Sequence, residues 1–428
     1  MRITAILATG LLVIATDNNA LSLQDAVGKA LDFNPNVKSL GAAVDTNDAR
    51  FRQSMGAYQP VIKIKMDKGA NRKTNGGNEP ASAGDWYNKT KSTLTLSQIL
   101  YDFGRISSQV RARSFSLQAS QHQLDSGKEK LAQLTASAFL EILKLEQIIK
   151  HVEDNIEFYN QFLEILEKRE QAGASAKSDV QRILSLVQNS ELELIGYKTD
   201  LSFARQTFKV IVGEEPKDLE VPVLDALTMD MSIDQLLEFA LEESHSILAR
   251  KATADAALQN LEKSRSDLYP KIKLDLEVAR ERSKDTSETW QTTESGTVTF
   301  SYDIWDGSIA RRKVDEKQAQ LMRAQYQVDE ARLAVEQQVR EAYNAMEKLK
   351  DEKKVIDASL ENNAQIVELY YKEFELGEKS LLDITTAQGA YHTSRIQSAS
   401  FYYDYYKSMF DIYFFMNDVI ATINRLDA

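Results

Sequence analysis

The chain has 428 residues, with 52 basic and 64 acidic side chains and a formal net charge of −12 at pH 7. This acidic balance disfavours nucleic acid as a partner, because nucleic-acid-binding domains carry clustered positive charge. The chain contains no cysteine, which excludes disulfides, thiolate metal sites, cysteine nucleophiles and a lipid-modified cysteine.

An apolar run near the N-terminus has the features of a secretory signal. Residues 3–15 follow Met1 and Arg2 and precede the polar stretch 16–19. A run of this length is too short to span a bilayer but suits the core of a signal peptide. We expect residues 1–20 to be a signal peptide, cleaved after about residue 15 or 20; a buried N-terminal helix is the alternative. No later stretch reaches the ~18 uncharged apolar residues of a membrane-spanning helix.

The first half of the chain reads as helix, two strands and two further helices. Helical periodicity ends at Pro60, after which apolar and charged residues alternate. A period of two is the pattern of a strand with one apolar face, so residues 60–100 are expected to form a β-hairpin. A long helix is expected over 105–171 and a returning helix over 176–212, with a break at Gly173.

The same order of elements returns in the second half. Pro270 lies 210 residues after Pro60, and Gly377 lies 204 residues after Gly173. The chain is therefore interpreted as a first repeat at 21–212, a linker at 213–231, a second repeat at 232–417 and a C-terminal tail at 418–428. Within the second repeat we expect a β-hairpin at 270–304, a long helix at 309–376 and a returning helix at 380–417.

Both long helices carry a heptad pattern. In the first, an apolar residue returns at every seventh position: Leu117, Leu124, Leu131, Ala138, Leu145, Val152, Tyr159 and Leu166. A period of seven sustained this long predicts a left-handed coiled coil. About 65 residues at ~1.5 Å each give a helix of about 100 Å, which is longer than the helices of ordinary globular domains.

Short motifs mark the same junctions in both repeats. They are Gln59-Pro60 and Tyr269-Pro270 before the strands, Tyr101-Asp102-Phe103-Gly104-Arg105 and Trp305-Asp306-Gly307 after them, and Gly173 with Asp179-Val180-Gln181 and Gly377 with Asp383-Ile384 at the helix turns. In this order and in duplicate, the motifs resemble the TolC family of outer-membrane channel proteins. The resemblance covers essentially the whole chain after the signal.

The resemblance implies the fold class and the assembly. It describes an α+β membrane protein, a tandem-repeat protomer whose long coiled-coil helices form a periplasmic α-barrel, with the linker 213–231 in its equatorial region. Four β-strands per chain would contribute to a 12-stranded outer-membrane β-barrel. Four strands cannot close a barrel, whose smallest form needs about eight, so several chains are needed; that there are three follows from the resemblance.

The function implied is a homotrimeric exit duct in the outer membrane of a Gram-negative bacterium, in contact with its lipid. Its expected partners are a periplasmic adaptor (membrane fusion) protein and an inner-membrane ABC or other transporter, which open it. The junction Leu100-Tyr101-Asp102-Phe103-Gly104-Arg105 is similar to that of members that serve type I protein secretion. Multidrug or small-molecule efflux is the alternative within the family, and a periplasmic structural coiled coil is the alternative outside it.

The resemblance also identifies candidate gate residues at the helix turns. Asp383 falls on the acidic motif of the periplasmic aperture, and Thr386 takes a position that is often acidic. Asp179 matches an aspartate that tethers neighbouring helices in the closed state, with Lys379 and Phe374 in place of its basic and aromatic partners. Phe374 has no hydroxyl, so we expect a looser latch. A simple helix-start role accounts for both aspartates as well.

The remaining candidates are structural. Gly173 and Gly377 are expected at the turns that contact the adaptor. Tyr101 and Trp305 stand at strand ends, where aromatic side chains favour a membrane interface; core packing is the alternative. The histidines show no metal-ligand spacing: His122, His151, His245 and His392. No catalytic triad, phosphate-binding glycine loop or dinucleotide motif appears, so we expect no enzyme, no metal site and no cofactor.

Overall fold

The structure is a computed structural model that describes residues 20–74, 83–216, 218–227, 231–283 and 287–426. Residues 1–19 of the expected signal peptide lie outside these ranges. The chain divides into two compact units. Unit 1 comprises Met1–Pro35, Lys128–Leu236 and Val339–Ala428, and unit 2 comprises Asn36–Gly127 and Leu237–Gln338. Each unit draws on both halves of the chain, so the compact units do not follow the sequence repeats.

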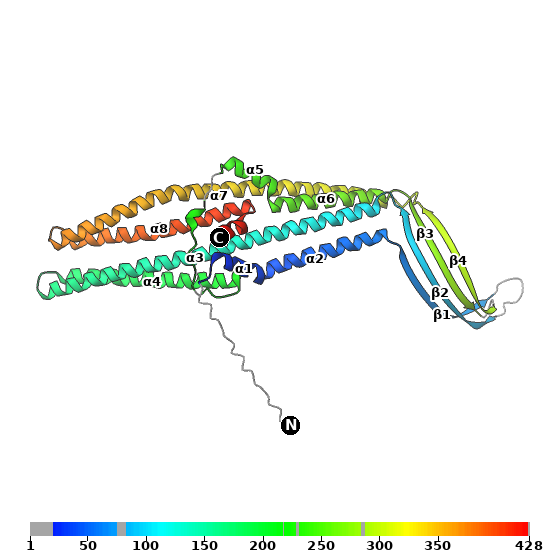
Figure 1. Cartoon of the computed structure of the whole chain (residues 1–428), viewed down its shortest axis with the longest axis horizontal. Coiled ribbons are helices and arrows are strands. Elements are labelled where there is room, and N and C mark those ends of the chain that lie inside the picture. Colours follow the sequence, from blue (N-terminus) through cyan, green and yellow to red (C-terminus); the bar gives the residue numbers. More distant parts are fainter. Residues whose placement is uncertain (1–19, 75–82, 217, 228–230, 284–286, 427–428) are drawn as a thin grey trace, which may run out of the picture. The chain divides into compact units, whose positions relative to one another are not determined.

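Helices make up most of the described chain (Figure 1). They are α1 (Leu23–Phe33), α2 (Pro35–Met55), η1 (Gly56–Tyr58), α3 (Arg105–Gln171), α4 (Lys177–Val212), η2 (Leu224–Ala226), α5 (Ile233–Glu243), α6 (His245–Ser266), α7 (Ile309–Glu375), α8 (Leu381–Phe415) and α9 (Val419–Leu426). The two long helices, α3 and α7, have 67 residues each, and both contribute residues to both units.

Among the residues that the structure describes, no helix has both the length and the apolar character that crossing a membrane requires.

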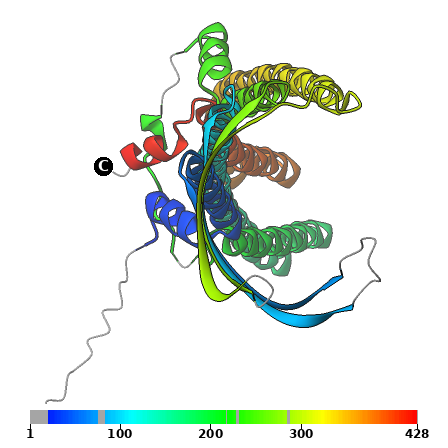
Figure 2. The same ribbon diagram turned by 90° about the vertical axis from the view of Figure 1, so that its right-hand side faces the viewer.

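Unit 2 contains one antiparallel sheet of four strands, which curves strongly along its length (Figure 2). The strands are β1 (Val61–Thr74), β2 (Ala83–Tyr101), β3 (Lys271–Ser283) and β4 (Ser287–Ser301), in the order β1-β2-β3-β4. Two hairpins, one from each repeat, are thus joined through β2 and β3. Within the described residues β1 pairs only with β2 and β4 only with β3, which makes these two strands the edges of the sheet.

The pairing register places apolar side chains on one face of this sheet. Residues directly opposite one another share a face, and Leu96 lies opposite Ile62 on one side and Leu276 on the other. We call the following residues the apolar face: Ile62, Ile64, Leu94, Leu96, Ile272, Leu274, Leu276, Val278, Val298 and Phe300. The other face is polar, with Thr95 between Lys63 and Glu277. The alternation read from the sequence therefore extends across all four strands.

The strand-to-helix junctions are built in the same way in both repeats. The backbone N–H of Ile106 donates to Asp102 Oδ2 (2.8 Å), and that of Ala310 donates to Asp306 Oδ2 (2.7 Å). Each aspartate thus satisfies an N–H group that the first helical turn leaves free. Residues with positive φ follow each aspartate: Phe103 (53°), Gly104 (86°), Gly307 (73°) and Ser308 (68°). The Asp-Phe-Gly and Asp-Gly motifs are therefore caps of α3 and α7.

A buried polar layer joins three helices in unit 1. Asn155 of α3 donates from its side-chain amide to Ser190 Oγ of α4 (3.1 Å) and accepts from Gln388 Nε2 of α8 (2.8 Å). All three side chains are buried. A buried polar group that loses its partner is costly, so this layer favours one axial register of α3, α4 and α8.

Candidate functional site

The turns that end the long helices have matching backbone geometry. Gly173 and Gly377 both adopt positive φ, 72° and 79°, a conformation that costs glycine nothing. The closing hydrogen bonds run from Gly173 N–H to Glu170 O (2.8 Å), Ala174 N–H to Arg169 O (2.8 Å), Gly377 N–H to Phe374 O (3.1 Å) and Glu378 N–H to Glu373 O (2.9 Å). This pair of bonds defines the Schellman motif, so both helix ends are closed locally by the glycine.

Asp383 closes the start of α8 as half of a capping box. Its backbone N–H donates to the Ser380 side chain, while its own carboxylate accepts from the Ser380 N–H (3.0 Å) and hydroxyl (2.7 Å). These hydrogen bonds hold the pKa of the Asp383 carboxyl below its usual value. The bond from the Ser380 hydroxyl contributes most, the bond from its N–H less, and the charge of Lys379 least. Ser followed three residues later by an acidic residue is a sequence signature of this cap, although the sequence analysis did not use it.

Asp179 stands at the equivalent place in α4 but is held more weakly. The cap residue there is Ala176, which has no side-chain acceptor, and among the described residues the one donor to the Asp179 side chain is Ser175 Oγ, at a long 3.4 Å from Oδ2. Lys379 Nζ lies over the ring of Tyr370, 4.4 Å from its centroid. Within the part of a single chain that the structure describes, no ion pair joins Asp179 to Lys379. The helix-start role thus explains Asp383 well and Asp179 only in part.

Phe374 lies in a core that joins both helical hairpins near their turns. Its ring centroid is 5.0 Å from the ring centroid of Phe162, and the guanidinium of Arg169 lies over the Phe374 ring, 5.0 Å from its centroid. The turn core comprises Tyr159, Phe162, Leu166, Ile183, Val187, Phe374, Leu381 and Ile384. Only 8% of Phe374 is exposed. Its position holds α3 and α7 together, a packing role that the sequence analysis did not assign to it.

The second turn exposes two large apolar side chains that the first turn lacks at the equivalent positions. Leu376 is 75% exposed and Leu382 49% exposed, while the positions 204 residues earlier hold Ala172 and Ser178. Thr386 donates its hydroxyl to Leu382 O (2.7 Å) and presents no charge. Sequence reasoning missed Leu376, because a single leucine directly after a helix carries no signal until the fold shows that its side chain is exposed.

The aromatic residues at the strand ends are exposed rather than packed in a core. Tyr101 is 54% exposed and Trp305 76% exposed. The ring of Phe103 contacts Tyr101 edge-on (centroids 4.7 Å apart) and stacks on Tyr269 (5.1 Å). This cluster lies where the strands give way to helices, directly beyond the apolar face.

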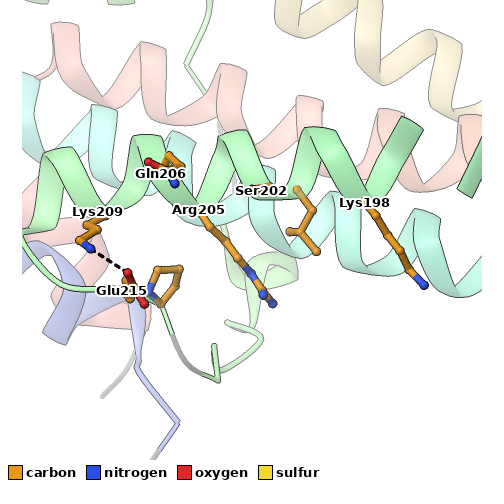
Figure 3. Close-up of a pocket in the computed structure, with 8 residues that line it drawn as sticks. Lys198, Ser202, Arg205, Gln206, Lys209 and Glu215 are labelled. Carbon is orange, nitrogen blue, oxygen red and sulfur yellow. Dashed lines mark hydrogen bonds and ion pairs between the residues drawn. The ribbon is translucent and has the colours of Figure 1, made fainter. Parts of the chain in front are cut away.

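A surface pocket of about 420 Å³ lies along α4 (Figure 3). Three basic side chains point from the helix toward it, and each has an acidic partner: Lys198 with Glu153 (3.0 Å), Arg205 with Glu146 (2.8 Å) and Lys209 with Glu215 (2.7 Å). Because these charges are paired within the chain, the pocket offers no surplus cation for an anionic ligand. It is not assigned a functional role.

Known proteins share both the sequence pattern and the fold. A sequence profile described as "Outer membrane efflux protein" matches residues 26–214 and 236–417. The chain belongs to this family. It is 23% identical to the outer membrane efflux protein BepC of Brucella suis over 90% of this chain and 82% of BepC, and 23% identical to protein CyaE of Bordetella pertussis over 76% and 68%. It is also 20% identical to the outer membrane protein TolC of Escherichia coli over 96% and 84%.

The fold agrees with that of a solved channel. The structure of the CmeC outer membrane channel of Campylobacter jejuni matches with a TM-score of 0.81, at 15% identity, over 99% of this chain and 97% of CmeC. The predicted TolC-family membership and the protomer fold, long helices with a four-stranded sheet, are thereby confirmed. The protein is an outer-membrane channel of the efflux family with a periplasmic tunnel, and it is not an enzyme. The alternative of a periplasmic structural coiled coil is set aside.

Proposed function

We propose that three copies of this chain form an exit duct for type I protein secretion, opened by a periplasmic adaptor and an inner-membrane transporter. The open sheet is the observation on which this rests. It has two edges, β1 and β4, and its apolar face is exposed in one copy. If further copies continue the sheet into a closed barrel with lipid outside, β1 and β4 each gain a paired strand and the apolar face is covered by lipid. Three copies supply twelve strands.

The choice of a protein as cargo rests on the strand-to-helix junction. Leu100 to Arg105 is similar to the junction of members that serve type I secretion, and within it Asp102 caps the start of α3. Small-molecule efflux is the second candidate, because the family description and the name of BepC both refer to efflux. The two functions differ in cargo and share the duct.

Deleting the gene separates the two candidates. For type I secretion we expect a large secreted protein to disappear from the medium while drug susceptibility changes by less than about twofold. For efflux we expect unchanged secretion with a several-fold fall in the drug concentration that stops growth. Both are measured on one deletion strain and on the same strain complemented with the intact gene. Unchanged secretion together with raised susceptibility would contradict our proposal and favour efflux.

The gate proposal assigns the aperture to Asp383 and Asp179. In a trimer each aspartate would occur three times around the tunnel, and three carboxylates at a constriction favour cations. Because the hydrogen bonds from Ser380 lower the pKa of Asp383, its carboxyl keeps its charge to a lower pH than an ordinary aspartate does. The capping contribution is likewise present above the unfolded-state pKa and is lost as pH falls through the folded-state pKa.

Two substitutions separate the charge of Asp383 from its role as a cap. Asp383→Asn removes the charge but keeps an oxygen that accepts from Ser380, whereas Ser380→Ala weakens the cap by ~1 kcal/mol and keeps the charge. In single-channel recordings we expect reduced cation preference in Asp383→Asn and little change in Ser380→Ala. Unchanged conductance and cation preference in both Asp383→Asn and Asp179→Asn would rule out the gate assignment.

The exposed leucines suggest where the adaptor binds. Apolar side chains at a helix turn invite an apolar partner surface, and the second turn alone offers Leu376 and Leu382. We expect Leu376→Glu to abolish cross-linking to the adaptor and to lower the export rate at least about tenfold. The reason is that burying a charge in such a contact costs more than ~1.4 kcal/mol. The matched control is Leu192→Glu, which places the same charge at a similarly exposed leucine of α4 (67% exposed), away from both turns. Export at the normal rate in Leu376→Glu would refute the assignment.

A further inference from the structure

Three side chains suited to hold a metal ion meet in unit 2. His122 and Asp125 lie three residues apart on α3, and His245 is the first residue of α6. One potential ligand atom from each lies within 4.8 Å of the other two. The two imidazole centroids are 5.6 Å apart. All three residues are half-buried, so the group lies between helices and not on an open surface.

Both histidines hold a nitrogen that the protein leaves unsatisfied. Nδ1 of His122 and Nδ1 of His245 are shielded from solvent, and neither has a hydrogen-bond partner among the residues that the structure describes. A buried polar atom without a partner costs about 1–3 kcal/mol, and native proteins hold few of them. Nδ1 of His151 and Nδ1 of His392 have no partner among the described residues either, so the feature that distinguishes His122 and His245 is their approach to each other and to the Asp125 carboxylate.

The backbone that presents His245 is held firmly. The preceding residue, Ser244, is buried at the break between α5 and α6. Its N–H donates to Ala240 O (3.2 Å), its carbonyl accepts from Leu248 N–H (3.0 Å), and its hydroxyl pairs with Ser246 Oγ (3.0 Å). On α3 the spacing of three residues puts His122 and Asp125 on the same helical face. The three ligands are therefore presented by fixed backbone, and only side-chain rotation remains.

The donor set selects the class of ion. Two imidazole nitrogens and one carboxylate oxygen suit zinc and its transition-metal neighbours, whereas calcium and magnesium require oxygen ligands. Zinc–ligand distances of ~2.0–2.1 Å place neighbouring ligand atoms of a tetrahedral site about 3.3 Å apart. The present spacing of up to 4.8 Å would contract by about 1.5 Å, which rotation of side chains can provide.

We propose that His122, Asp125 and His245 bind one divalent transition-metal ion, with zinc as the best match, and that this ion ties α6 to α3. The three protein ligands leave a fourth position for water. Because α3 belongs to the first repeat and α6 to the second, the ion fastens the two repeats together within unit 2. The proposal does not depend on the cargo of the channel.

The internal repeat supplies a prediction of stoichiometry. The positions equivalent to the three ligands are Tyr326 and Asp329, 204 residues later, and Pro35, 210 residues earlier. Neither imidazole is repeated, so the second copy of the pattern has no site. We therefore expect one ion per chain. Sequence analysis found no ligand spacing because 123 residues separate His122 from His245, and only the fold brings them together.

The test uses the full-length, untagged channel in detergent, stripped with a chelator and titrated with zinc by calorimetry at pH 7.5. We expect one ion per chain and a loss of affinity of at least about tenfold in His122→Ala and in His245→Ala, by analogy with the effect of disturbing a metal ligand shell. His151→Ala is the matched control, because it removes another half-buried histidine of α3 and should bind zinc normally.

A second variant and a second readout guard against misfolding. Asp125→Asn keeps the side-chain shape, so it is expected to retain the oligomer while weakening zinc binding. Cobalt added to the stripped wild type should give a visible absorption band that all three ligand variants lack and His151→Ala retains. Folded ligand variants that bind zinc as tightly as the wild type, or a wild type that binds none, would overturn the proposal.

Discussion

Leu96→Arg is expected to prevent assembly of the membrane-embedded part of the protein. Leu96 lies in the middle of the apolar face, opposite Ile62 and Leu276. An arginine on a lipid-facing position near the bilayer midplane costs ~2–4 kcal/mol, and each copy in an oligomer bears that cost. We expect the heat-modifiable oligomer in the outer-membrane fraction to fall by at least about tenfold, measured by electrophoresis of heated and unheated samples.

The neighbouring residue on the same strand is the matched control. Thr95 points to the polar face, between Lys63 and Glu277, where an added arginine can pair with the Glu277 carboxylate, and water screens its repulsion from Lys63. Thr95→Arg should therefore assemble normally, although its larger, charged side chain should alter conductance. If Leu96→Arg also assembled at the wild-type level, the apolar face would not be the surface that meets lipid, and the proposed barrel would be wrong.

Local patterns in the sequence predicted the individual elements well. A period of two after Pro60 and Pro270 reflects strands with one apolar face, and α3 spans Arg105–Gln171, the range over which a long helix was expected. The repeated Asp-Phe-Gly and Asp-Gly motifs recur because each repeat needs an aspartate cap and left-handed residues at the same corner. These features depend on neighbours within a few positions, so a single chain displays them.

Contacts between distant segments could not be read in the same way. The pairing of β2 with β3 sets a register such as Leu96 opposite Leu276, and alternation alone would also permit a shift by two residues. The polar layer around Asn155 draws on three helices. The His122–His245 approach and the burial of Phe374 likewise depend on how helices pack side by side, which heptads leave open to several registers.

Phe374 gives the second large effect that we expect. Its ring fills the turn core against Phe162 and supports the guanidinium of Arg169, so Phe374→Ala leaves a cavity between the two helical hairpins. Truncating a buried phenylalanine costs ~3–5 kcal/mol, and the lost cation–π contact adds ~0.5–1 kcal/mol. We expect a lower melting temperature of the purified channel and a larger single-channel conductance, because the turns are no longer held together.

Two conservative variants separate packing from latching at the same position. Phe374→Leu keeps an apolar side chain, so a packing role predicts a smaller loss of stability and near-normal conductance. Phe374→Tyr adds the hydroxyl whose absence suggested a loose latch. If the latch dominates, the tyrosine variant should close more tightly and conduct less than the wild type. If packing dominates, as the burial of Phe374 indicates, the added hydroxyl must be desolvated, so the tyrosine variant should gain no closure and lose some stability.

A Phe374→Ala channel with unchanged melting temperature and conductance would exclude both roles, leaving control of the aperture to the charges at Asp179 and Asp383.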